Sequence, residues 1–93
     1  MIRSFGNDAT QRVFEGLVVK EIPPRMQQRA LAKLQMINAA GDLADLEAVK
    51  SNMLELLSGE RNGKHCICVD LHGRICFRWV DGHAYDVEIF GYH

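Results

Sequence analysis

Two arginines and an aromatic–imidazole pair near the end of the sequence have the side chains that chemistry on a phosphate requires. Arg74 and Arg78 stand four residues apart in `RICFRWV`, so both lie on one face if this segment is a strand. A guanidinium binds phosphate oxygens through two parallel hydrogen bonds. The last two positions are Tyr92 and His93, a ring that can stack on a base and an imidazole that titrates near neutral pH.

Cleavage of RNA without a metal ion needs a base for the 2′-OH, a cation beside the phosphate and an acid for the leaving 5′-oxygen. Arg74 is the candidate cation, and His93 is the candidate acid or base. Tyr92 could stack on a base or donate a proton, and Glu55 is a candidate base on the first predicted strand. Further phosphate contacts are expected from three cations, Arg61, Lys64 and Arg78.

Each signal also has an ordinary structural explanation. Arg78 lies opposite Asp86 in the register derived below, which is typical of a surface ion pair. A terminal Tyr-His pair also suits a frayed tip or an aromatic lid. A basic stripe at Arg25, Arg29 and Lys33 is typical of a solvated helix face.

The three cysteines, Cys66, Cys68 and Cys76, are expected to be free thiols, because an odd number without a secretion signal favours a reducing compartment. A zinc site with His72 can be drawn on the same strand face, but its spacing matches no common zinc motif. The turn at `LHG` is expected to place Cys68 opposite Cys76. We therefore predict neither a metal site nor a disulfide, and no cofactor.

Two helices are expected to position these residues. The first is predicted over 8–17 with Asp8 as its N-cap, and the second over 23–41, from a proline pair to Gly41 as its C-cap. An apolar face recurs along the second helix, at Met26, Ala30, Leu34 and Ile37. A short helical turn or a loop is expected over 42–49.

The pattern then changes from a helical period to alternation, which predicts strands at 52–57, 64–70, 74–80 and 84–90. Ile75, Phe77 and Trp79 share one face, as do Tyr85, Val87 and Ile89. For these two sets of residues to lie on the same face of the sheet, the last hairpin needs a three-residue loop at 81–83. This loop pairs Trp79 with Tyr85 and Phe77 with Val87.

The predicted fold is α+β in one domain spanning 1–93, with two N-terminal helices packed on one face of a mainly antiparallel four- to five-stranded sheet. The opposite face is then polar and carries Arg74, Arg78, Tyr92 and His93. A net charge of −1 indicates that any nucleic-acid contact depends on a local patch. Without a signal peptide or an apolar run of membrane-spanning length, we expect a cytoplasmic protein.

Four segments resemble HigB toxins of the RelE/ParE superfamily, namely `MIRSF`, `LAKLQMINAAGDLADL`, `LSGERNGKH` and `RICFRWVDGHAYDVEIFGYH`. The resemblance covers essentially the whole chain. It implies a RelE-like fold and a metal-independent, ribosome-dependent endoribonuclease that cuts mRNA in the A site. It also implies a HigA-like helix-turn-helix antitoxin as partner, contact with operator DNA only through that complex, and no membrane association.

The resemblance assigns the family's sheet arginine to Arg74 and its terminal Tyr-His pair to Tyr92 and His93. Glu55 stands where some members have a histidine, and Gly91 stands where an acidic residue is usual.

Three further positions depart from the family pattern. Met53 and Cys68 replace arginines, and Gly73 replaces a tryptophan. Gly91, Met53, Cys68 and the net charge of −1 leave open a catalytically inactive relative that binds only its antitoxin and modulates repression. The resemblance to the superfamily leaves a second alternative, a gyrase-type inhibitor.

Overall fold

Helices come first along the chain and an antiparallel sheet follows, as predicted. The computed structural model of the protein describes residues 1–57 and 63–91. Its strands pair in the order β1-β2-β3-β4, each antiparallel to the next. The elements are α1 (Asp8–Phe14), α2 (Pro24–Ala39), α3 (Leu43–Glu47), a 3₁₀ turn (Lys50–Asn52), β1 (Glu55–Leu56), β2 (Lys64–Cys68), β3 (Arg74–Val80) and β4 (His83–Phe90).

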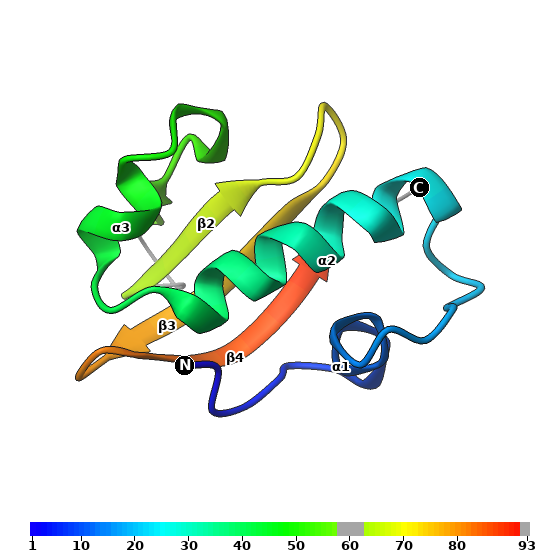
Figure 1. The fold of residues 1–93 in the computed structure, drawn as a ribbon, viewed down its shortest axis with the longest axis horizontal. Helices are drawn as coiled ribbons and strands as arrows, with labels where there is room; N and C mark the ends of the chain where they lie inside the picture. The colour runs from blue at the N-terminus through cyan, green and yellow to red at the C-terminus, as the bar shows by residue number, and fades with distance from the viewer. Residues whose placement is uncertain (58–62, 92–93) are drawn as a thin grey trace.

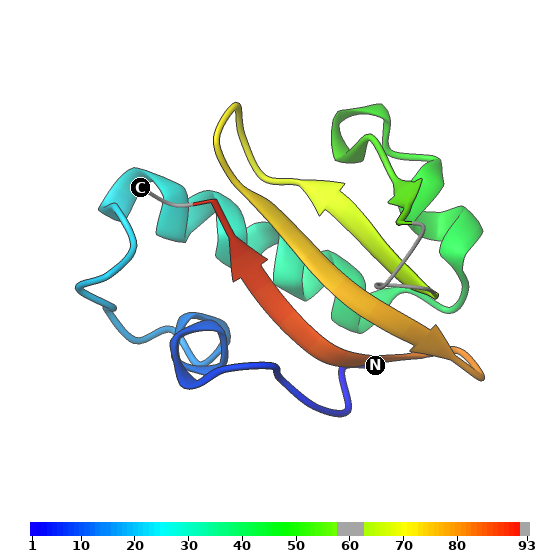
Figure 2. The same ribbon diagram turned by 180° about the vertical axis from the view of Figure 1, so that it is seen from behind.

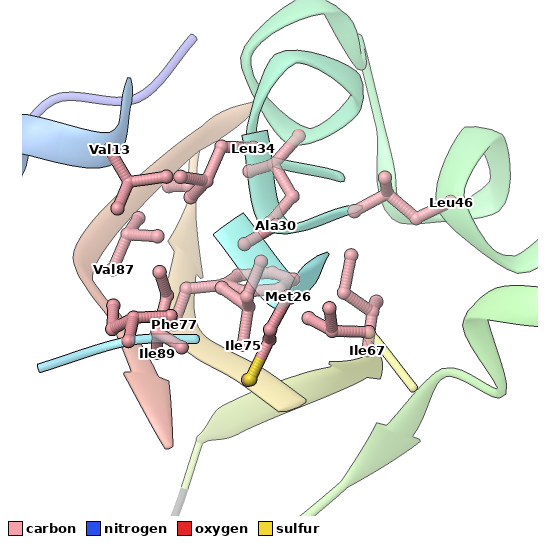
Figure 3. Close-up of a cluster of buried hydrophobic side chains, with 14 of the residues drawn as sticks. Val13, Met26, Ala30, Leu34, Leu46, Ile67, Ile75, Phe77, Val87 and Ile89 are labelled. Atoms are coloured by element: carbon pink, nitrogen blue, oxygen red, sulfur yellow. The ribbon is translucent and has the colours of Figure 1, made fainter. Parts of the chain in front are cut away.

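Helix α2 lies across one face of the sheet, with α1 beside β4 and α3 near β1 and β2 (Figure 1). Its predicted apolar face is buried, since Met26, Ala30, Leu34 and Ile37 are each at most 4% exposed. The core also takes side chains from α1, α3 and the sheet, and they meet in one cluster (Figure 3). Seen from behind, the opposite face of the sheet carries no helix (Figure 2).

The ends of the first two helices differ from the prediction. Asn7, not Asp8, caps α1, because its side chain accepts a hydrogen bond from the Thr10 amide at 2.9 Å. Helix α2 ends at Ala39 with an extended Ala40 as its C-cap, so Gly41 does not end it. The segment 42–49, predicted as a short helical turn or a loop, contains the helix α3.

The β3–β4 hairpin contradicts the predicted three-residue loop. Val80 pairs with His83 across a two-residue turn, in which Asp81 and Gly82 both have positive φ angles, of 50° and 82°. An irregularity follows between Cys76 and Arg78, where Asp86 on β4 has a φ of 54°. Because β4 has one extra residue at this point, the strands return to the predicted register beyond it, and Ile75 pairs with Ile89.

The two-residue turn reverses which residues of β4 face the core between the turn and the bulge. Ala84 is fully buried where Tyr85 was expected, whereas Val87 and Ile89 point inward as predicted. Tyr85 therefore lies on the open face.

The outer edge of β4 is partly covered by the N-terminal segment. Ile2 and Phe5 form isolated parallel bridges to Ala84 and Val87. The sheet thus has four strands, within the predicted range, and a covered edge. Within the described residues, no helix is long and apolar enough to cross a membrane.

Candidate functional site

The open face of the sheet holds the two arginines of β3. Ile75 and Phe77 are fully buried beneath α2, and the alternation of the strand places Arg74 and Arg78 on the other side, where both are exposed. The predicted face assignment of β3 is therefore correct. Figure 2 views this face, with β3 between β2 and β4.

Arg74 forms an ion pair with Glu55. The Arg74 Nη1 atom lies 3.0 Å from Glu55 Oε1, and the two side chains are 55% and 56% exposed. In the register, Glu55 lies opposite Cys66, and Arg74 lies opposite Cys68. The pair therefore reaches from β3 across β2 to β1, so two candidate catalytic side chains are in direct contact.

A cavity of about 250 Å³ adjoins this ion pair. Two apolar side chains at its edge are strongly exposed, Met53 at 72% and Leu71 at 97%. The hollow has room for a phosphate group next to Arg74. It is lined by Met53, Glu55, Cys66, Ile67, Cys68, Asp70, Leu71, His72, Gly73 and Arg74.

Arg78 is engaged in structural contacts. Its Nε donates to Asp86 Oδ2 at 2.8 Å, and its guanidinium carbon lies 5.6 Å from the centre of the Tyr85 ring. The hydrogen bond from Arg78 lowers the pKa of Asp86. Lys64 pairs with Arg78 in the β2–β3 register, so the two predicted phosphate-binding cations of the described region are neighbours.

Arg61, Tyr92 and His93 lie outside the described residues, so their roles stay predictions. Gly91, the last described residue, lies beside the turn between β2 and β3. Gly91 has a φ of 77°, and a β-carbon added there would collide with the backbone oxygen of His72 on the cavity wall. This geometry gives a physical reason for glycine where the resembling toxins have an acidic residue.

The turn between β2 and β3 contains a residue that sequence reasoning missed. Asp70 Oδ1 accepts hydrogen bonds from the His72 and Gly73 amides at 2.8 and 2.9 Å. The bond from His72 is the main cause of the lowered pKa of Asp70. The sequence does contain a signal for this turn, because Asp70 stands two residues before His72 and three before Gly73. An Asx turn is determined by such local spacing.

Gly73 stands where the resembling toxins have a tryptophan, and Met26 of α2 occupies the space beside it. A β-carbon on Gly73 would collide with the Met26 Cε atom. Met26 is 4% exposed and packs among the core residues labelled in Figure 3. The Met26 side chain from α2 therefore compensates for the absence of a tryptophan ring at position 73.

The cysteines differ from the prediction. Cys66 and Cys76 are opposite each other and form a disulfide, whereas Cys68 faces Arg74 and is free. The expectation of three free thiols and the pairing of Cys68 with Cys76 are both wrong, because the Asp70 turn shifts the register of β2 by two residues. No cluster of three or more potential metal ligands occurs within 1–57 and 63–91.

Comparison with known proteins shows the family of the chain. Residues 3–93 match the family described as the RelE-like toxin of the type II toxin–antitoxin system HigB. The Endoribonuclease HigB of Proteus vulgaris is 31% identical over 93 residues, which cover both chains completely. Toxin HigB-1 of Vibrio cholerae serotype O1 is 35% identical over 63 residues, covering 68% of this chain and 66% of the relative.

Proposed function

Because the chain belongs to the HigB family of RelE-like toxins of type II toxin–antitoxin systems, we propose that it is an endoribonuclease that cleaves mRNA on the ribosome and so inhibits translation. The observation that carries this proposal is the Arg74–Glu55 contact on the open face, at 3.0 Å and beside a cavity. The name of the full-length relative, an endoribonuclease, supports the reaction type.

In the proposed reaction, Arg74 binds the non-bridging oxygens of the scissile phosphate and stabilises the charge that develops there. Phosphate binding draws Arg74 away from Glu55. The released carboxylate accepts the proton of the 2′-OH, whose oxygen attacks phosphorus.

The leaving 5′-oxygen takes a proton from the end of the chain, with His93 as donor and Tyr92 stacked on a base. The products are a 2′,3′-cyclic phosphate and a 5′-OH end, and no step requires a metal ion. Lys64 and Arg61 hold neighbouring phosphates. Arg78 contributes positive charge to the same face although it is paired with Asp86.

The proposed partners follow from membership of the family. A HigA-like helix-turn-helix antitoxin binds and neutralises the toxin, and operator DNA is contacted only through that complex. Ribosomes and mRNA are the targets, which places the protein in the cytoplasm.

The test is cleavage of mRNA on programmed ribosomes, with new 5′ ends mapped. We expect cuts in the A-site codon by the wild type and a loss of about 10²–10³-fold in Arg74→Ala, as for removal of a group that stabilises transition-state charge. Glu55→Gln should lose about 10²–10⁴-fold if Glu55 is the base. Arg12→Ala is the matched control, since it removes an exposed arginine from α1.

A second function is favoured by the replaced arginines. Met53 and Cys68 line the cavity where the resembling toxins carry positive charge. Without sufficient cations the chain would bind its antitoxin and modulate repression but leave mRNA intact. Uncut message at stoichiometric protein, together with tight antitoxin binding, would replace the nuclease proposal by this one.

A further inference from the structure

A row of four side chains crosses the open face of the sheet from edge to edge. The strand register aligns Glu55 with Cys66, Cys66 with Cys76, and Cys76 with Glu88. The two central members are joined as a disulfide. A covalent link between β2 and β3 therefore lies in the middle of the face that carries the proposed nuclease site.

The disulfide lies next to the proposed catalytic groups on the sheet. The Arg74–Glu55 ion pair crosses β2 near Cys66 and Cys68. Both Cys66 and Cys76 are only 2% exposed, although none of the described helices covers this face. Arg74 on β3 and Glu55 on β1 lie on either side of β2, the strand that carries Cys66. A change in the spacing of β2 and β3 at the disulfide would therefore also change the relative positions of Arg74 and Glu55.

The cavity provides an approach to this sulfur pair. Cys66 and the free, half-buried Cys68 both line it, together with Glu55 and Arg74. A small thiol or disulfide entering the cavity would therefore meet cysteine sulfur and the proposed catalytic groups in the same space.

We propose that Cys66 and Cys76 form a thiol–disulfide site that takes small-molecule disulfides of the glutathione class and controls the RNA-cleaving face. This inference rests on the proposed function for its effect on cleavage. The bonded state holds β2 and β3 in the arrangement that places Arg74 and Glu55 beside the same cavity. The reduced state displaces them.

The redox step exchanges two electrons. The thiolate of one cysteine attacks the small-molecule disulfide, forms a mixed disulfide and releases one thiol. The thiolate of the second cysteine then attacks the protein sulfur of the mixed disulfide and releases the other thiol. The two cysteines lose two protons and two electrons, and the small disulfide is reduced to two thiols.

Reduction of the disulfide must change the positions of Arg74 and Glu55, because the two sulfur atoms then need more space. Two thiol sulfurs must separate to nonbonded contact, roughly 3.5–4.0 Å, whereas a disulfide holds them together. Close-packed surroundings have little free space for this movement. The movement must therefore shift β2 against β3, and the relative positions of Arg74 and Glu55, which lie on either side of β2, change with it.

The experiment equilibrates the full chain in buffers of graded reduced-to-oxidised glutathione ratio. Intact mass after alkylation gives the oxidised fraction, and cleavage on programmed ribosomes gives the rate. We expect the rate to follow the oxidised fraction and to fall about tenfold on reduction, less than the roughly 10²-fold that a 1 Å misplacement of reacting groups can cost. The NMR signal of the Arg74 Nε–H group should shift between the two states.

Two variants serve as controls. Cys66→Ala with Cys76→Ala should cleave at one rate at every glutathione ratio, whereas Cys68→Ser should keep the wild-type ratio of oxidised to reduced rates. Equal wild-type rates in both states would overturn the switch and leave the nuclease intact. Absence of cleavage at every glutathione ratio would instead overturn the proposed function. In that case the NMR signal still tests the switch, because an Arg74 signal that is the same in the oxidised and reduced states would overturn it as well. A chain that forms no Cys66–Cys76 bond at any ratio would also overturn it.

Discussion

The backbone at Gly91 gives a physical reason for the absence of a side chain there. Its left-handed φ of 77° and the nearby His72 oxygen leave no room for a side chain. We predict that Gly91→Asp, which introduces the family's usual acidic residue, lowers cleavage on programmed ribosomes, because the added side chain must push the backbone at Gly91 away from the His72 carbonyl. Gly91→Ala separates the two effects, since it adds the β-carbon without the charge. Faster cleavage by Gly91→Asp than by the wild type would show that the carboxylate, not the backbone, limits the site.

His65 makes stability depend on pH. Burial lowers its pKa, its ring stacks on Phe77, and its buried Nδ1 atom has no hydrogen-bond partner among the described residues. The unfolded chain binds the proton near pH 6.5, but the folded chain binds it only at lower pH. The free energy of unfolding should therefore fall as pH drops from about 6.5 towards the lowered pKa, and should not change from this cause at higher pH.

The measurement is the melting temperature of the wild type and of His65→Phe at pH 7.5 and pH 5.5. The phenylalanine keeps a ring against Phe77 and has no proton to bind. We expect a smaller decrease in the variant. Equal decreases in both proteins would assign the pH dependence to other groups.

At the scale of elements, the β3–β4 hairpin depends on its turn. Gly82 has a φ of 82°, which a β-branched side chain adopts only with strain. We predict that Gly82→Val destabilises the fold by about 1–3 kcal/mol. For a chain of this length, each 1 kcal/mol lowers the melting temperature by about 4–8 °C. Asp81→Asn is the control, because asparagine also suits a positive φ, and an unchanged melting temperature of Gly82→Val would contradict the turn geometry.

The same hairpin shows how far sequence reasoning reaches. The alternation of apolar and polar residues correctly predicted that Ile75 and Phe77 face the core. The direction of these side chains depends only on the pattern within one strand. The bulge at Asp86 could not be predicted, since its amide donates to Ser4 Oγ at 2.8 Å, from a segment 82 positions away. The residue pattern of β4 alone carries no information about a contact with the distant Ser4.

The first strand and the cysteines show the same limit. The segment 52–57 was predicted as strand, but only Glu55–Leu56 pairs. Asn52 is instead buried and donates to the Leu46 carbonyl at 2.9 Å, and it accepts a bond from Lys33 of α2. Lys33 thus belongs to a tertiary contact and not to a free basic stripe. The candidate ion pair of Arg74 with Glu55 likewise depended on a register that the turn at Asp70 decides.

The charge of the whole molecule sets how strongly RNA binding depends on salt. A net charge of −1 gives no general attraction to a polyanion, so binding must come from a few cations on the open face. Each phosphate contact to a single strand contributes about −0.7 to the slope of log K against log salt concentration. With two or three such contacts, we predict a slope of about −1.4 to −2.1 for a single-stranded mRNA oligonucleotide, measured by fluorescence anisotropy.

Arg74→Ala should make this slope shallower by about 0.7, whereas Arg12→Ala should not change it. The result distinguishes a local site from a broad basic surface. A wild-type slope steeper than about −4 would require at least six phosphates, more than the cations assigned to the open face can supply. The exposed Arg25 and Arg29 of α2 would then have to take part, and the RNA path would have to continue past the β2–β3 turn, where Arg29 contributes to lowering the pKa of Asp70.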